Sequence, residues 1–275
     1  MRVILVPVAD RPECARALDT AFALGKKLCA SVSGCHFRLH KGSDLTLSSE
    51  FVAAAWHKKS TSQSRAAAET LYRRMAEKHG YELIHRPRTT PGALWAERVG
   101  SPHKLMSIVG PLSDLIVISR PRRKNGVAGM FLHAALMHCT TPVLLLPQAG
   151  RIRIGHRVCI AWDQGAGVTR TVTASIPLLQ LADEVTIVTC GPEDRPGPKA
   201  AQLVAYLKHW GVKAKRVRTR GRHVETELME ACQEANADLI VSGAYSRQRW
   251  YEKVLGGTTE FLIHETKLPV LMQHV

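Results

Sequence analysis

The stretch that decides the fold is the closing segment ADLIVSGAYSRQRWYEKVLGGTTEFLIHETKLPVLMQHV, residues 237–275. A short apolar run at 239–241 leads to Gly243, and a basic, aromatic loop then leads to the glycine pair at 256–257 and an apolar run of helical length. Strand, glycine-bearing loop and helix N-terminus can together hold phosphate, because free backbone N–H groups and the helix dipole both favour an anion. An alternative stays open from spacing alone: the glycines serve only to make turns.

Three segments of the first half return in the second half in the same order. The pairs are 3–10 with 157–163, each a short apolar run that ends near an Asp, 113–118 with 237–242, and 141–145 with 268–272. The repeat predicts two copies of one domain, residues 1–148 and 155–275, joined by a short linker. The polar residues 38–60 predict an insertion in the first copy.

The predicted strands are short, continuous apolar runs, and helical patterns lie between them. Apolar side chains recur at helical spacing over 14–30, 63–79, 168–181, 200–210 and 223–235. Residues 92–109 are also expected to be helical, with a break at Gly100, Ser101 and Pro102. Strands that alternate with helices and lack a polar face are typical of a parallel sheet covered on both sides. The sequence therefore predicts an α/β fold with two tandem parallel sheets.

The composition is that of an ordinary globular protein, with 45% hydrophobic and 22% charged residues. No apolar run approaches the ~18 residues of a membrane helix. After Arg2 the chain enters the strand-like run VILVPV and lacks the long apolar region of a signal peptide. We therefore expect a cytoplasmic protein with no membrane partner.

The formal charge of +15 is unevenly divided. Residues 1–150 carry 21 Lys and Arg against 10 Asp and Glu, whereas residues 151–275 carry 17 against 13. A basic surface attracts nucleotides, nucleic acid or acidic proteins without choosing among them. The basic run at 213–220 reads as an edge strand that charge protects against pairing, with nucleic-acid contact as the weaker alternative. We do not expect a nucleic-acid partner.

In a parallel sheet the ligand site lies at the carboxyl ends of the strands, at the topological switch point. Asp163 follows the first strand of the second copy, Cys190 follows the second, and a loop follows Gly243. An Asp at this place can accept hydrogen bonds from ribose hydroxyls; the alternative is that Asp163 caps the following helix. The seven cysteines are scattered without C-x-x-C spacing, and no phosphotransferase, hydrolase or zinc-protease motif occurs, so no catalytic residue, disulfide or metal site is predicted.

Taken together, these residues resemble a tandem-domain universal stress protein. The family pattern is an Asp after the first strand, then glycine, two residues, glycine, nine residues, glycine and a Ser or Thr. Asp163, Gly243 and Gly256 match this pattern, Ser246 replaces the second glycine, and Gly257 stands where Ser or Thr is usual, with Thr258 and Thr259 following. The resemblance implies five-stranded parallel domains, an ATP or related adenine-nucleotide site, and backbone contacts from Cys190 to the adenine.

The first copy departs further from the family pattern. Ala9 stands where the Asp is expected, Asp10 comes one place late, and the basic run at 120–124 replaces the phosphate loop. We therefore expect the first domain to bind no nucleotide. The resemblance also implies a pseudo-dimer within one chain through 143–146 and 270–272, and further dimerisation stays open.

These observations predict a stress-response switch whose second domain binds ATP or another adenine nucleotide, with at most a slow ATPase activity. The alternative is an interaction scaffold of the same fold that binds no nucleotide. The sequence does not identify protein partners.

Overall fold

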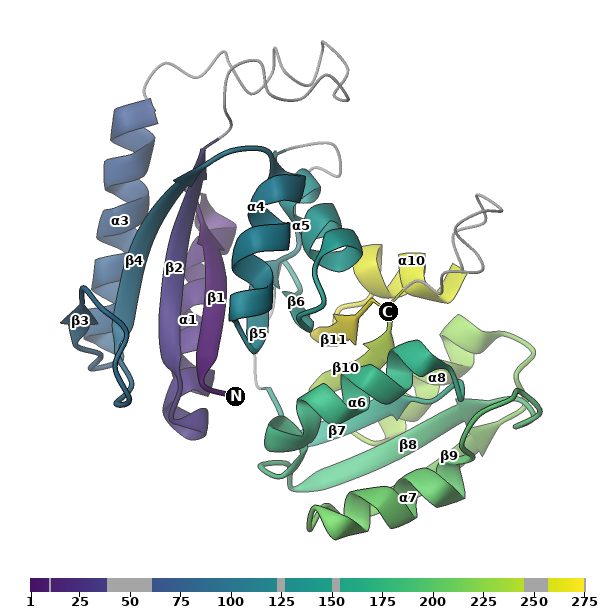
Figure 1. Cartoon of the computed structure of the whole chain (residues 1–275). Helices are drawn as coiled ribbons and strands as arrows, with labels where there is room; N and C mark the ends of the chain where they lie inside the picture. The colour runs from purple at the N-terminus through teal and green to yellow at the C-terminus, as the bar shows by residue number, and fades with distance from the viewer. Residues whose placement is uncertain (10, 39–60, 123–126, 150–153, 245–256, 275) are drawn as a thin grey trace. The chain divides into compact units, whose positions relative to one another are not determined.

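The computed structural model describes residues 1–9, 11–38, 61–122, 127–149, 154–244 and 257–274. The chain forms two compact units, Met1–Gln148 (unit 1) and Ala149–Val275 (unit 2) (Figure 1). The insertion predicted at 38–60 lies almost wholly outside the described residues. Each unit is an α/β sheet with helices on its faces, which confirms the fold class expected from the sequence.

Unit 1 contains a parallel sheet with the strand order β3-β4-β2-β1-β5-β6. Its elements are β1 (Val3–Val8), α1 (Pro12–Leu28), β2 (Ser31–Arg38), α3 (Thr61–Lys78), β3 (Leu83–Ile84), β4 (Ala93–Val99), α4 (Pro102–Val109), the 3-10 turn η1 (Gly110–Leu112), β5 (Leu115–Ser119), α5 (Val127–His138) and β6 (Val143–Leu146). The two-residue strand β3 adds a sixth strand to the five expected. Every residue of β5 and β6 is buried, as a sheet covered on both faces requires.

Unit 2 contains a parallel sheet with the strand order β11-β10-β7-β8-β9. Its elements are β7 (Arg157–Ala161), α6 (Ala166–Leu179), β8 (Glu184–Cys190), α7 (Ala200–His209), β9 (Ala214–Thr219), α8 (Val224–Glu234), β10 (Leu239–Gly243), α10 (Gly257–His264) and β11 (Val270–Gln273). The chain moves outward from β7 to β9 and then returns to β10. Right-handed crossovers consequently place α6 and α7 on one face and α8 and α10 on the other (Figure 1).

One helix prediction is wrong in its first half. The helical pattern expected over 92–109 is a strand, β4, followed by the helix α4. Strand β4 pairs in parallel with β2 along seven residues, from Val32 opposite Ala93 to Arg38 opposite Val99. The long neighbouring strand decides the conformation here, because strand formation depends on partners that a local pattern does not contain.

An aspartate at the same place in each unit explains the repeated Asp-Leu-Ile-Val segment. In unit 1, Asp114 Oδ2 accepts hydrogen bonds from the amides of Arg2 and Val3, at 2.5 and 3.0 Å. In unit 2, Asp238 accepts them from three successive amides, those of Gly155 (3.0 Å), His156 (3.1 Å) and Arg157 (3.1 Å). Each aspartate thus fixes the start of the strand that pairs beside it.

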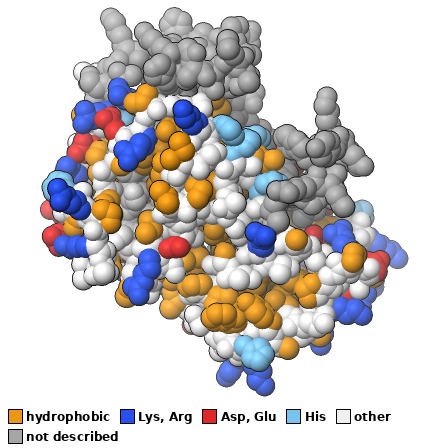
Figure 2. Space-filling view, in the orientation of Figure 1, with side chains coloured by type: hydrophobic (Ala, Val, Ile, Leu, Met, Phe, Trp, Pro, Cys, Tyr) orange, Lys and Arg blue, Asp and Glu red, His pale blue; other side chains and the backbone are white. Residues whose placement is uncertain are grey.

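The helix layer of α6 and α7 is partly apolar on its outer surface. Hydrophobic side chains gather over these helices (Figure 2), where Leu181, Tyr206 and Trp210 are 43%, 37% and 45% exposed. The rings of Tyr206 and Trp210 meet edge to face, with centroids 6.4 Å apart. Across the described part of the chain, no helix has the length and apolar character needed to cross a membrane.

Candidate functional site

The candidate site lies at the carboxyl edge of unit 2, between β7 and β10. These strands are parallel neighbours, with Leu239 opposite Val158 and Val241 opposite Ile160. The chain leaves β7 toward β8 and leaves β10 toward β11, so the sheet has its topological switch point here. Open α/β sheets bind ligands outside the carboxyl ends of the strands at such a point.

Gly243 ends β10 in direct contact with the backbone of α6. A Cβ atom at this position would lie 2.8 Å from the Val168 amide nitrogen and 3.1 Å from the Gly167 carbonyl carbon. Backbone atoms cannot give way as the end of a side chain can, so only glycine fits. Gly243 therefore permits the backbones of β10 and α6 to approach closely, which is a different role from making a turn.

Asp163 lies at the start of the loop from β7 to α6. Its Oδ1 accepts a hydrogen bond from the amide of Gly165 at 2.9 Å, and its Oδ2 accepts one from Arg195 Nη1 at 3.1 Å. Gly165 is itself the N-cap residue of α6, so Asp163 fixes the loop just before the helix and is not the helix cap that the alternative proposed. The Asp163 side chain is 57% exposed, and its oxygens keep lone pairs for further donors.

The loop after β7 is tied to the loop after β8 through Gln164. Gln164 Nε2 donates to the carbonyls of Arg195 (3.2 Å) and Gly197 (3.1 Å), and Arg195 N donates back to Gln164 Oε1 at 3.3 Å. Gln164 has a φ of 64°, and a Cβ on Gly197 would lie 2.1 Å from the Gln164 carbonyl oxygen. The Trp162 indole adds a 2.9 Å hydrogen bond to the Pro198 carbonyl. Two loops at the carboxyl edge therefore form one braced structure.

Cys190 and Thr258 both meet the N-terminus of α8. Cys190 Sγ lies 3.9 Å from the carbonyl oxygen of Val224, and burial raises the pKa of this thiol. Thr258 Oγ1 donates to Oε1 of the neighbouring Glu225 at 2.9 Å. A Cβ on Gly257 would lie only 3.1 Å from the same oxygen. The N-termini of α8 and α10 are therefore joined through the Glu225 carboxylate.

The turn that precedes α8 is fixed by Glu227. Its carboxylate accepts hydrogen bonds from the amides of Gly221 (2.6 Å), Arg222 (2.8 Å) and His223 (3.1 Å). The nearby Thr219 hydroxyl, together with these amides, lowers the pKa of Glu227 to about 2. The preorganised turn holds Glu225 in its place at α10.

The structure brings the predicted residues together in two groups. Asp163 and Gly243 meet at the N-terminus of α6, whereas Cys190, Gly257 and Thr258 meet at that of α8. Thr259 is the third residue of α10, and Ser246 and Gly256 lie outside the described residues. Sequence reasoning missed Gln164, Arg195 and Glu225, because their contacts join separate segments and leave no motif. It also missed Glu227, whose contacts are local to the turn before α8.

The corresponding edge of unit 1 is filled by aromatic side chains. His36 is buried, with Nδ1 2.9 Å from the Val8 carbonyl oxygen and its ring stacked on Trp95 at 6.4 Å. Phe37, near the end of β2, stacks on Phe131 of α5 with centroids 4.9 Å apart and planes 14° apart. These side chains occupy the edge of β1 and β2 that in unit 2 carries Asp163 and Cys190.

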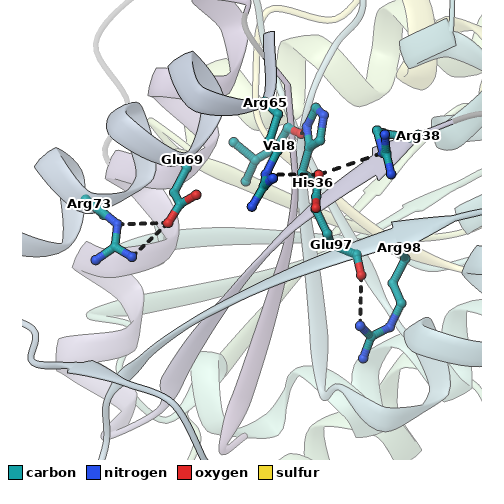
Figure 3. A network of polar contacts seen from close by, with 8 residues as sticks. All are labelled: Val8, His36, Arg38, Arg65, Glu69, Arg73, Glu97 and Arg98. Carbon is teal, nitrogen blue, oxygen red and sulfur yellow. Dashed lines mark hydrogen bonds and ion pairs between the residues drawn. The ribbon is translucent and has the colours of Figure 1, made fainter. Parts of the chain in front are cut away.

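A charged network extends the filled edge of unit 1 (Figure 3). The Glu97 carboxylate near the end of β4 faces Arg65 Nε of α3 at 3.3 Å and Arg38 Nε of β2 at 3.8 Å. Arg98 Nη1 donates a hydrogen bond to the Glu97 backbone carbonyl at 2.8 Å. Arg38 and Arg65 at this edge therefore already face a carboxylate of the protein itself, that of Glu97.

The described residues contain no group of three His, Cys, Asp or Glu side chains placed to hold a metal ion. All seven cysteines lie within the described ranges and carry thiols.

Comparison with known proteins assigns a family to the second unit. Residues 173–274 match the model of the universal stress protein family. No curated protein matches the chain in sequence.

Solved structures share the whole architecture. A universal stress protein from Archaeoglobus fulgidus DSM 4304 is 17% identical with a TM-score of 0.69, over 98% of this chain and 97% of that one. A protein of unknown function from Pseudomonas aeruginosa PAO1 is 15% identical with a TM-score of 0.57, over 100% and 92%. A universal stress protein in complex with cAMP, at a TM-score of 0.35 and 13% identity over 54% of this chain and 98% of that one, is too distant to bear on the ligand.

The first two likenesses establish the fold across both units, and the family model identifies unit 2. The chain therefore carries a universal stress protein domain in its second unit, in a two-unit arrangement consistent with a tandem-domain member of that family.

Proposed function

We propose that unit 2 binds ATP or a related adenine nucleotide at its carboxyl edge, and that the chain works as a ligand-controlled switch in a stress response. One observation carries the proposal: Gly243 touches the backbone of Val168, so the ends of β10 and α6 approach as closely as backbones can. A glycine that is required there for space agrees with the family's nucleotide pattern, which begins at this residue.

Each site residue has a proposed role. Asp163 accepts hydrogen bonds from the ribose hydroxyls with the lone pairs that Gly165 and Arg195 leave open. The Cys190 backbone contacts the adenine. Gly257, Thr258 and Thr259 contact the phosphates at the N-terminus of α10, and the family pattern assigns Gly243, Ser246 and Gly256 to the same phosphate site. We assign no catalytic residue, so ATP hydrolysis is at most a slow side activity.

The proposal is tested by thermal unfolding of the intact chain with and without ATP or AMP. A ligand present at a hundred times its Kd stabilises a protein by about 2.7 kcal/mol, which corresponds to a rise in Tm on the order of 10 °C for a domain of this size. Asp163→Ala should remove most of the rise. Asp183→Ala is the matched control, because Asp183 is exposed and pairs with His156 at the opposite end of the sheet. An equal rise in Asp163→Ala contradicts the site assignment.

A second candidate function is a scaffold of the same fold that binds no nucleotide. The observation that favours it is the engagement of two site residues by the protein itself: Asp163 by Arg195, and Thr258 by Glu225. A chain whose Tm responds to no adenine compound would establish this second function.

We further propose that the two units pair within the chain through Val143–Leu146 and Val270–Gln273. Each of these strands is the last strand of the sheet of its own unit. A last strand offers unpaired backbone groups, which stable proteins cover. The family resemblance supports the same pairing.

A further inference from the structure

The N-terminus of α10 in unit 2 is already in contact with a carboxylate of the same unit. Glu225 belongs to α8, 33 residues away in sequence, and accepts the hydroxyl proton of Thr258 at 2.9 Å. The same Glu225 oxygen lies 3.1 Å from the position of a Cβ on Gly257. The contact therefore reaches the first two residues of the helix that would face the phosphates.

A helix N-terminus favours one negative partner, because its first amides lack acceptors within the helix and the dipole is positive there. Two acidic side chains lie at this end of α10. Glu225 approaches from outside, and Glu260 stands in the first turn, where it also pairs with His264 at 3.3 Å. A phosphate at the N-terminus of α10 would therefore face two carboxylates. A helix N-terminus without nearby carboxylates would attract the phosphate.

The glycine at position 257 makes room for this carboxylate. A larger residue would place its Cβ within 3.1 Å of Glu225 Oε1, closer than ordinary van der Waals contact. A Ser or Thr at this place would require Glu225 Oε1 to shift by a few tenths of an ångström. Gly257, which stands where the family pattern has Ser or Thr, therefore lies directly beside the Glu225 carboxylate.

The approach of Glu225 is also prepared by its own helix. Glu227, two residues later, binds the three amides of the preceding turn and so fixes the first turn of α8. Glu225 is thus held on a rigid element, where a surface glutamate in a loop would simply turn into solvent.

We propose that Glu225 determines the specificity of the unit 2 site by repelling the phosphate chain, so that adenosine binds in preference to ATP. This inference rests on the proposed adenine site and adds the chemical class of its ligand. Like charges at hydrogen-bond distance disfavour each other, and a carboxylate that faces a phosphate must move away or lose affinity. An uncharged ligand end meets no such repulsion.

The test is calorimetric titration of the full chain and its variants with adenosine, AMP and ATP, at fixed ionic strength and without divalent cations. In Glu225→Gln, the amide oxygen can still accept from Thr258, but the charge is gone. We expect the wild-type protein to bind adenosine more tightly than ATP. Glu225→Gln should bind ATP about tenfold more tightly than the wild type does, with adenosine affinity changed by less than about twofold. Glu230→Gln is the control, since Glu230 is exposed on the same helix.

The outcomes separate the two proposals. If wild type and Glu225→Gln both bind adenine ligands with the same ratio of ATP to adenosine affinity, the role of Glu225 is overturned and the adenine site stands. If neither protein binds any of the three ligands, the adenine site itself is overturned, and the specificity proposal with it. Glu225→Ala provides a second charge-removing variant should Glu225→Gln not fold, and it must raise the ATP affinity in the same direction.

Discussion

The Thr258 hydroxyl and the Glu225 carboxylate form a 2.9 Å hydrogen bond that joins the N-termini of α10 and α8. The pair stands at the place where the proposed ligand would present its phosphates. A second internal pair, Asp163 with Arg195, stands at the proposed ribose end. Both ends of the candidate site are therefore held by the protein's own charges, and a ligand must fit around them or displace them.

Gly243→Ala should destabilise the protein by about 1–3 kcal/mol, because its Cβ would lie 2.8 Å from the Val168 amide nitrogen. Denaturant unfolding without ligand measures the change. The matched control is Gly167→Ala in α6, whose Cβ would lie 3.5 Å from the Gly243 Cα, an ordinary contact. That control should be neutral or stabilising, since alanine is the better helix former. Equal stability of the Gly243 variant and the wild type would refute the close-approach argument.

Loss of Asp238 should cost more stability than loss of Asp114. Asp238 accepts three backbone amides and is half-buried, whereas Asp114 accepts two and is exposed. We expect about 2 kcal/mol for Asp238→Ala and about 1 kcal/mol for Asp114→Ala, from the usual worth of hydrogen bonds to a charged group. Urea unfolding checks the order, and a reversed order would contradict this assignment.

Glu227 should make folding depend on pH in the acid range. Its pKa of about 2 in the folded protein lies below the usual value of about 4.3 for a glutamate. The folded state therefore gains stability from ionised Glu227 above pH 4.3, and that gain is lost as the pH falls toward 2. The difference in unfolding free energy between wild type and Glu227→Gln should shrink over this window. A difference that is constant with pH would exclude the mechanism.

Nucleotide should bind with a stoichiometry of one per chain. The Phe37–Phe131 stack and buried His36 fill the edge of unit 1 that corresponds to the candidate site in unit 2. Phe131→Ala should therefore cost about 3 kcal/mol of stability and leave nucleotide affinity unchanged. Titration calorimetry gives the stoichiometry and the affinity, and denaturant unfolding gives the stability. Two equivalent sites per chain would contradict the prediction that only unit 2 binds nucleotide.

Pairing of the two units should protect both outer strands from hydrogen exchange. Backbone amides in Val143–Leu146 and Val270–Gln273 should exchange as slowly as those of the inner strands β1 and β7. Exchange at the rate of exposed edges would show that the units do not pair through these strands.

The sequence revealed what depends on local patterns. Continuous apolar runs marked the buried strands, and the repeated Asp-Leu-Ile-Val segment marked an aspartate that each unit uses in the same way. The spacing around Gly243 also pointed to the switch point of unit 2. These signals could be found because each one is imposed by a single element and its covalent neighbours.

Contacts between separate loops could not be predicted. Arg195 reaches Asp163 across 32 residues, and Glu225 reaches Thr258 across 33, with no pattern that would pair them. Strand β4 was read as helix for the same reason, because its conformation is decided by β2. The residues that tune the site are thus the ones that only the folded structure reveals.

The most direct test of the adenine site is whether the intact purified chain releases an adenine compound on denaturation, or binds one when it is added. Chromatography of the released material and calorimetric titration with adenosine, AMP and ATP answer both questions. We predict binding of an adenine compound at one site per chain and its loss in Asp163→Ala. A protein that retains nothing and responds to none of the three would contradict the account.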